Sequence, residues 1–232
     1  DLLLFMTQDA IPADEMLVEH LVMQFSLPQV KAAYARQLPK PGCSTLEAYT
    51  RGFNYPPESD IKDYGDLPKL GLKTFFCSNV CAMYDRKVYE ELGGFVTHTI
   101  FNEDMIYAAG LIEAGYSIAY AADAQVYHSH NYGCIAQMKR NFDLGVSQAQ
   151  YPEIFEKYPS EGEGIRMVRQ TAAYVCRIQR PWLLVPLFFQ SGFKYLGYLL
   201  GKHYQRLPRG VIRHCTMNRN WWKFPVRKRR KR

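Results

Sequence analysis

The sequence opens with an apolar run that constrains the fold more than any other feature. Residues 2–6 read Leu-Leu-Leu-Phe-Met, and the polar turn Thr7-Gln8-Asp9 follows directly. A short continuous apolar run that ends at a turn is typical of a strand buried on both faces. The run therefore predicts an α/β fold in which this segment is a central strand of a mixed sheet with flanking helices.

Helix and strand signals then alternate along the chain. A helix is predicted over residues 15–22, with Asp14 as its N-cap residue and Pro28 beyond its end. The further predicted elements are, in order, a long surface excursion over 37–74, a strand over 73–82, a helix over 86–92 capped by Asp85 and stopped by Gly93-Gly94, a helix over 103–114 capped by Asn102, and strands over 117–120 and 125–128.

Length and composition indicate a folded protein. The chain has 232 residues, of which 47% are hydrophobic and 22% charged, as in ordinary globular domains. This length suits one domain with an appended segment. We expect an α/β domain over residues 1–158 and a helical segment over 159–232 that is first apolar and then basic. A central strand rarely opens a chain, so we also expect sheet strands upstream of residue 1.

The C-terminal segment has the composition of a membrane-associated helix. Residues 182–200 are nearly continuous in Trp, Leu, Val, Phe and Tyr, although Pro186, Gln190 and Lys194 interrupt them. A spanning helix needs about 20 predominantly apolar residues. The interruptions favour a helix that lies in the membrane interface, with a true span as the alternative.

The positive charge is concentrated at the C-terminal end. Of 29 Lys and Arg residues, 12 lie within 201–232, where there is no Asp or Glu, which leaves 17 basic against 22 acidic residues in the rest. Such a segment favours anionic lipid headgroups. Binding of a nucleic acid through Trp221-Trp222 and residues 227–232 is an alternative, but the acidic body disfavours it, and we expect no nucleic-acid partner.

The cysteines indicate a reducing compartment. Their spacing contains no CxxC pair, which favours free thiols over zinc ligands or disulfides. Together with the basic tail, this predicts a cytoplasmic protein that associates peripherally with the inner face of the plasma membrane. The six positions are 43, 77, 81, 134, 176 and 215.

Two acidic positions are candidates for chemistry. Asp9 follows the opening strand in a turn that Pro12 closes, where a carboxylate is well placed to bind a hard cation such as Mg²⁺ or Mn²⁺. Glu103 and Asp104 fall in the first turn of a predicted helix, whose dipole favours the ionised form, and an ionised carboxylate can take a proton from a hydroxyl group. Each position taken alone is also ordinary for a turn or a helix start.

Two histidines form a further candidate. His128 and His130 are two residues apart on an extended segment, so both side chains can face one side. They could bind a metal ion or a phosphate, although such a pair is more often structural.

In combination, these pieces resemble the family 2 glycosyltransferases of the GT-A fold, and most closely their bacterial rhamnosyltransferase-like group. The resemblance covers nearly the whole chain. The segments that carry it are, in order, 7–10 (TQDA), 37–39 (QLP), 51–55 (RGFNY), 78–79 (SN), 93–95 (GGF), 103–105 (EDM), 122–132 (ADAQVYHSHNY), 194–198 (KYLGY) and 201–202 (GK).

The resemblance implies a reaction and a site. An inverting, metal-dependent transferase would move a sugar, rhamnose from dTDP-rhamnose by the closest group, to a polysaccharide or lipid-linked acceptor in cell-surface polysaccharide synthesis, including O-antigen. Asp104 would be the general base, supported by Glu103, and Asp9 would bind Mg²⁺ or Mn²⁺. The remaining implied residues are His128 as a second metal ligand and, for substrate binding, Gln8, Ser78, Asn79, Gly94 and His130.

The sequence departs from the family pattern in two places. The metal motif has one acidic residue, because Gln8 and Ala10 flank Asp9, so His128 or His130 is expected to complete the ligands. The family's N-terminal nucleotide-binding strands are absent before residue 1, which suggests a fragment of a longer protein. The alternative function is a membrane-associated scaffold that has lost catalysis.

Overall fold

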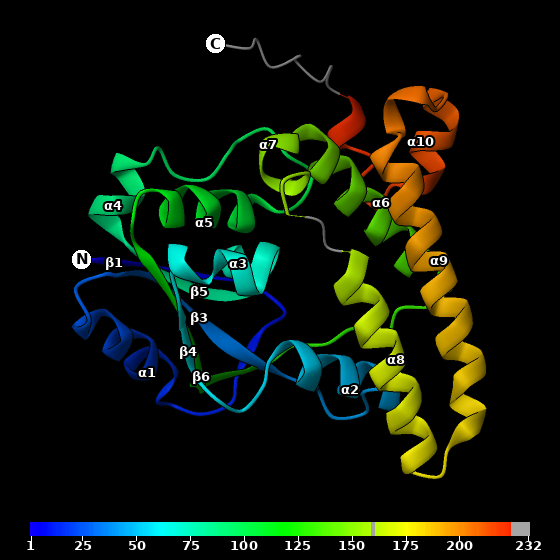
Figure 1. The fold of residues 1–232 in the computed structure, drawn as a ribbon, viewed down its shortest axis with the longest axis horizontal. Coiled ribbons are helices and arrows are strands. Elements are labelled where there is room, and N and C mark those ends of the chain that lie inside the picture. Colours follow the sequence, from blue (N-terminus) through cyan, green and yellow to red (C-terminus); the bar gives the residue numbers. More distant parts are fainter. Residues whose placement is uncertain (159–160, 224–232) are drawn as a thin grey trace.

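The computed structural model describes residues 1–158 and 161–223, and its centre is a six-stranded mixed sheet (Figure 1). The strand order is β1-β5-β3-β6-β2, and β4 also pairs with β6. β3 and β6 are parallel, whereas β5 is antiparallel to both β1 and β3. The strands are β1 (Leu2–Met6), β2 (Ile11–Pro12), β3 (Val30–Leu38), β4 (Asp60–Lys62), β5 (Cys81–Asp85) and β6 (Ser117–Tyr127).

These pairings give β1, β3 and β6 one direction, so their carboxyl ends lie at one edge of the sheet. Open α/β sheets bind their ligands at this edge, in the crevice outside the carboxyl ends of the strands. β5 runs the other way and begins at this edge, which brings the residues before Cys81 to the same place.

Helices cover both faces of the sheet, and each face has its own core. β3 shows why: Ala32 and Tyr34 pack on the side of α5 (Glu103–Glu113), while Ala33 and Ala35 pack on the side of α1 (Leu17–Met23). This is the period-two alternation of a strand. Figure 1 shows α3 (Leu67–Leu70) and α5 on one face and α1 on the other. The predicted α/β class with flanking helices is confirmed.

A helical unit stands beside the carboxyl edge of the sheet (Figure 1). Its longest helices are α6 (Cys134–Gln150), α8 (Glu161–Arg177) and α9 (Leu184–Lys202). α6 and α9 cross at glycines: a Cβ atom at Gly197 would lie 2.0 Å from the Met138 carbonyl oxygen, and one at Gly201 would lie 2.1 Å from that of Phe142. Only glycine permits backbones to approach so closely.

The other helices are short. The α-helices are α2 (Thr45–Asn54), α4 (Arg86–Glu91), α7 (Pro152–Phe155) and α10 (Arg209–Cys215), and the 3₁₀ turns are Gln24–Ser26, Tyr64–Asp66, Gly71–Phe75, Pro181–Leu183, Tyr204–Arg206 and Trp221–Lys223. The predicted capping of α4 is confirmed, because the Asp85 carboxylate accepts a hydrogen bond from the Val88 amide.

Several predicted elements are wrong in detail. β1 is an edge strand of the described sheet, with Leu4 and Met6 exposed, because tertiary pairing and not apolarity places a strand in the sheet. The strand predicted over 73–82 is a 3₁₀ turn followed by β5, and the two predicted pieces 117–120 and 125–128 are one strand, β6, with an irregular register. The first helix begins at Leu17, where Asp14 accepts a hydrogen bond from the Met16 amide.

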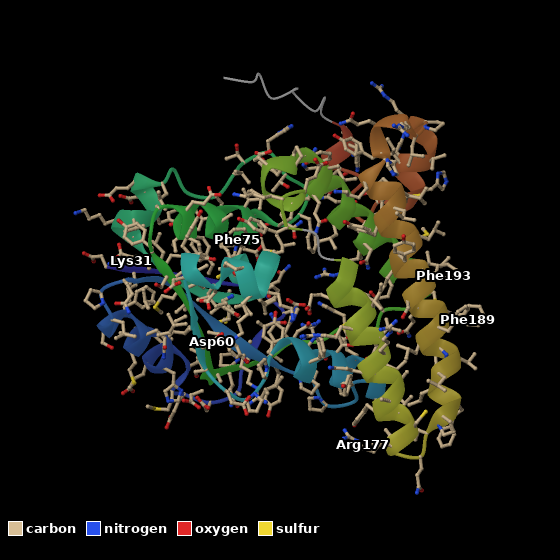
Figure 2. All side chains as sticks on the ribbon, in the orientation of Figure 1. Lys31, Asp60, Phe75, Arg177, Phe189 and Phe193 are labelled. Atoms are coloured by element: carbon tan, nitrogen blue, oxygen red, sulfur yellow. The ribbon has the colours of Figure 1, made fainter. Side chains whose placement is uncertain are left out.

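Among the described residues, one helical stretch, 181–202, is long and apolar enough to cross a membrane. Only 6% of its apolar window is buried. Its exposed apolar side chains are Trp182, Val185, Phe188, Phe189, Tyr195, Leu196 and Leu199, and Figure 2 shows Phe189 on the outer side of α9. The basic run 227–232 lies outside the described residues.

Candidate active site

Two strand ends bring together one carboxylate and two imidazoles. Asp9 follows β1, and His128 and His130 follow β6. The Asp9 Oδ2 atom lies 3.2 Å from His130 Nε2 and 3.4 Å from His128 Nε2, and the two imidazole nitrogens lie 3.2 Å apart. The residues predicted to bind metal therefore form one cluster, and their role as metal ligands stays a prediction.

The spacing of these three atoms fits a divalent cation. Ligand atoms about 2.1 Å from a common ion lie ~3.0 Å apart at right angles and ~3.4 Å apart at tetrahedral angles. The observed separations of 3.2 to 3.4 Å fall in this range. One side of the cluster is open, because the Asp9 side chain is 39% exposed, which leaves room for further ligands.

The charge states also suit a cation. Burial lowers the pKa of His128 to about 4 and lowers that of His130, so both imidazoles are neutral at pH 7 and keep a nitrogen lone pair. Burial acts to raise the pKa of Asp9, but the Thr7 side chain and the two imidazoles outweigh it, and the pKa lies below its ordinary value. An ionised carboxylate with two neutral imidazoles is the protonation state that metal binding requires.

Gln37, buried near the end of β3, orients His128. Its Oε1 atom accepts hydrogen bonds from His128 Nδ1, at 2.9 Å, and from the Arg51 guanidinium. The acceptor fixes the proton on Nδ1 and so turns the Nε2 lone pair toward Asp9, as outer partners of metal-bound histidines do. The Gln37 Nε2 atom donates to Ser78 Oγ, at 3.0 Å, and to the Tyr55 hydroxyl.

Asp104 lies across the same edge of the sheet, at the start of α5. Its Oδ2 atom accepts a hydrogen bond of 3.2 Å from the Asn79 amide, and the Asn79 side chain in turn accepts one from Tyr84. Burial, and then the charge of Glu103, raise the pKa of Asp104 to about 6. Because Ser78 and Asn79 are consecutive, hydrogen bonds run from His128, which lies beside Asp9, through Gln37 to Asp104.

The turn into α5 differs from its predicted form. Asn102 has the left-handed φ of 63° and makes no side-chain cap. Its side-chain amide instead donates to Ser147 Oγ on α6. A buried hydrogen bond holds this uncommon conformation, and it fixes the direction in which α5 presents Glu103 and Asp104.

Two predicted substrate-binding residues are less well placed. Gln8 is exposed beside Asp9 and makes no side-chain hydrogen bond to any described residue. Gly94, with φ of 66°, packs against the Tyr89 ring within an aromatic cluster that includes Phe95, and its described contacts are there and not with the cluster around Asp9. A positive φ, together with this close packing, is a structural reason for the glycine.

Residues that the prediction missed also belong to this site. Gln37 and Arg51 were noticed only as parts of resembling segments, and nothing in their local spacing marked them. Lys40 reaches the cluster as well, since its Nζ atom donates to the Asp9 carbonyl at 2.7 Å. These contacts join segments far apart in sequence, so no local pattern signals them.

Comparisons with known proteins give two curated relatives. The chain is 43% identical over 224 residues to the O-antigen chain rhamnosyltransferase RfbN of Salmonella typhimurium, covering 96% of this chain and 71% of that protein. It is 42% identical over 224 residues to the O-antigen chain rhamnosyltransferase WbaN of Salmonella anatum, covering 96% of this chain and 70% of that protein. A scan against models of protein families gives no match.

Among solved structures, the chain is similar to a mannosyltransferase of Pyrobaculum calidifontis in complex with GDP-Man and Mn²⁺. The TM-score is 0.46 and the identity 15%, with 96% of this chain and 63% of that chain covered.

The curated relatives give the class, which is that of the glycosyltransferases. Within it, the chain belongs to the family of the O-antigen chain rhamnosyltransferases. The predicted resemblance is confirmed at this level, whereas family 2 and the GT-A type stay predictions.

Proposed function

We propose that this chain contains the catalytic centre of an inverting rhamnosyltransferase of the GT-A type in O-antigen synthesis, with dTDP-rhamnose as donor and a lipid-linked glycan as acceptor. The observation that most supports the proposal is the joined arrangement of two charged centres. Asp9 and its histidines form one, Asp104 forms the other, and Gln37 with the Ser78-Asn79 segment connects them.

Asp9, His128 and His130 are the residues that would hold a divalent cation. Bound there, the cation would offset negative charge on the diphosphate of the donor. Two imidazole nitrogens favour Mn²⁺ over Mg²⁺, which prefers oxygen ligands and retains its water. Lys40, whose ammonium group lies at the Asp9 carbonyl, adds positive charge beside the same diphosphate.

Asp104 is the proposed general base. It takes the proton from the attacking acceptor hydroxyl, and a base is most effective when its pKa lies just below the working pH. Its raised pKa of about 6 meets this condition. In a single displacement the acceptor hydroxyl and its base lie on one side of the anomeric carbon, and the nucleotide diphosphate leaves from the opposite side. The configuration of the anomeric carbon is thereby inverted. Burial, and after it the charge of Glu103, keeps the pKa of Asp104 high. The further proposed substrate contacts are Gln8, Ser78, Asn79, Gly94 and His130.

The outer side of α9 is the proposed membrane contact. Its exposed aromatic and aliphatic side chains suit the headgroup region of a bilayer, and the opposite side is occupied by α6 through Gly197 and Gly201. A helix packed along its protein in this way favours lying on the membrane over spanning it. With the basic C-terminal residues, this supports a peripheral location at the inner face of the plasma membrane.

The test of the transferase is product formation from a panel of nucleotide sugars with lipid-linked acceptors, with and without Mn²⁺. We expect transfer from dTDP-rhamnose that requires the metal ion and is lost in Asp104→Asn. Equal turnover by Asp104→Asn would refute the assignment of the base. If the folded wild-type protein forms no product with any donor, the scaffold alternative is favoured.

The test of the membrane contact is sedimentation with anionic vesicles. We expect binding to weaken when residues 224–232 are deleted and again in Phe188→Ser, and binding that neither change affects would refute the proposed contact.

A further inference from the structure

A cavity of about 250 Å³ adjoins the metal-binding cluster on the side of the helical unit. His130 belongs to both the cluster and the cavity wall. The other wall residues come from α2, from the segment that joins β6 to α6, and from α6, α8 and α9, so the cavity lies between the carboxyl edge of the sheet and the helical unit.

Lys194 on α9 contributes a positive charge to the cavity wall. It makes no hydrogen bond or ion pair with any described residue, and burial lowers its pKa. The nearest acid that shares the wall, Glu47, already forms an ion pair of 2.8 Å with Arg51. A partly desolvated ammonium group without a partner is unfavourable unless a ligand supplies the opposite charge.

The first turn of α6 adds hydrogen-bond donors to the same wall. Gly133, its N-cap residue, lines the cavity and offers no side chain to cap the free amides. Gln137, only 8% exposed, also lines the cavity, and its side-chain amide has no hydrogen-bond partner among the described residues. A helix N-terminus, an amide and an ammonium group around one cavity suit an anion with several oxygens, such as a phosphate group.

The remaining wall indicates which phosphate compound fits. Met167, Val168 and Leu187 form an apolar side, on the two helices α8 and α9. Phe188 and Phe189, which follow Leu187 on α9, are exposed. A compound that joins a diphosphate to a lipid chain matches both the polar and the apolar side of the cavity. A nucleotide has no lipid chain to place against the apolar side.

We propose that this cavity binds the diphosphate of the lipid-linked acceptor, with Lys194 and Gln137 as its ligands. The inference rests on the proposed function, because it concerns the acceptor of that reaction. It also gives a role to the segment 194–198, which belongs to no part of the catalytic centre. The acceptor diphosphate would sit next to the cluster that holds the donor diphosphate, with only His130 between them.

The test measures binding of farnesyl diphosphate by calorimetry, with EDTA present so that the metal-binding cluster cannot contribute. We compare the wild-type chain with Lys194→Gln, with Ser191→Asp, which places a carboxylate in the cavity wall, and with the matched control Lys202→Gln at the end of the same helix. Circular dichroism verifies that each variant is folded. Farnesol and dTDP are the comparison ligands.

We expect the wild type and Lys202→Gln to bind farnesyl diphosphate, and Lys194→Gln to bind it about tenfold more weakly, as the loss of one charged hydrogen bond predicts. Ser191→Asp should weaken it further. Equal binding by all variants, no binding at all, or tighter Lys194-dependent binding of dTDP would overturn the proposal. Asp104→Asn should bind the lipid diphosphate as the wild type does, because Asp104 is not part of the cavity wall. If the transferase assignment is wrong but this inference is right, the wild type will bind farnesyl diphosphate and transfer no sugar.

Discussion

Replacing Asp104 by asparagine should make the protein more stable while it abolishes turnover. The carboxyl group has an ordinary pKa of 3.8 and a pKa of about 6 in the folded protein, because burial and Glu103 disfavour its charge. The difference corresponds to ~3 kcal/mol of unfavourable free energy in the folded state at pH 7. Asparagine has nearly the same shape and can still accept the hydrogen bond from the Asn79 amide.

The pH dependence gives the sign of this effect. Well below pH 3.8 the group is protonated in both states and contributes nothing. As the pH rises toward 6, the unfolded chain ionises first, so the wild type loses stability that Asp104→Asn retains. Urea unfolding at pH 4.5 and pH 7.5 should therefore show a larger advantage of the variant at the higher pH, up to ~3 kcal/mol.

The activity measurement completes the test. Removal of a general base typically lowers the rate by about 10²- to 10⁴-fold, and the wild-type rate should fall below an apparent pKa of about 6. Glu103→Gln is the matched control, and it should keep most of the activity with a lower apparent pKa. A variant Asp104→Asn that is less stable than the wild type at pH 7.5 would show that the carboxylate is not strained, and our account of its pKa would be wrong.

Three further predictions concern other parts of the molecule. His128→Ala should weaken Mn²⁺ binding, measured by paramagnetic resonance, by at least about tenfold. The control is His20→Ala on α1, which should bind Mn²⁺ with the affinity of the wild type. Gln37→Leu should also weaken Mn²⁺ binding ~10- to 100-fold through the lost hydrogen bond to His128, and unchanged affinity would refute its orienting role. Gly197→Ala should destabilise the protein by ~1–3 kcal/mol, since its Cβ would meet Met138. Gly192→Ala on the same helix has open space and should not.

The site was predicted in parts and assembled only by the fold. Asp9 and His128 each follow a strand, and Asp104 lies in the first turn of a helix, and such positions are visible in the sequence. Their meeting depends on β1, β3 and β6 pointing the same way, which follows from the pairing with β5. Gln37 escaped the prediction because it sits inside a strand, and its four partners come from distant segments.

For helix α9 the sequence predicted the element, and the structure added its packing. The apolar composition of residues 182–200 was enough to predict a helix. The glycine crossing with α6 was not visible, because a glycine in an apolar helix can equally be a defect or a contact surface. The structure distinguishes these, since Gly197 and Gly201 are buried against Met138 and Phe142.

By itself, the sequence determined the α/β class, the order of the chemical groups along the chain and the family resemblance, because local periodicity and short motifs record these directly. Only the tertiary structure decided that β1 lies at an edge of the described sheet, that Asp9 meets two neutral imidazoles, and that Lys194 lines a cavity without an ion-pair partner among the described residues. Those properties depend on which distant segments pack together, and on the water that this packing excludes from each charged group.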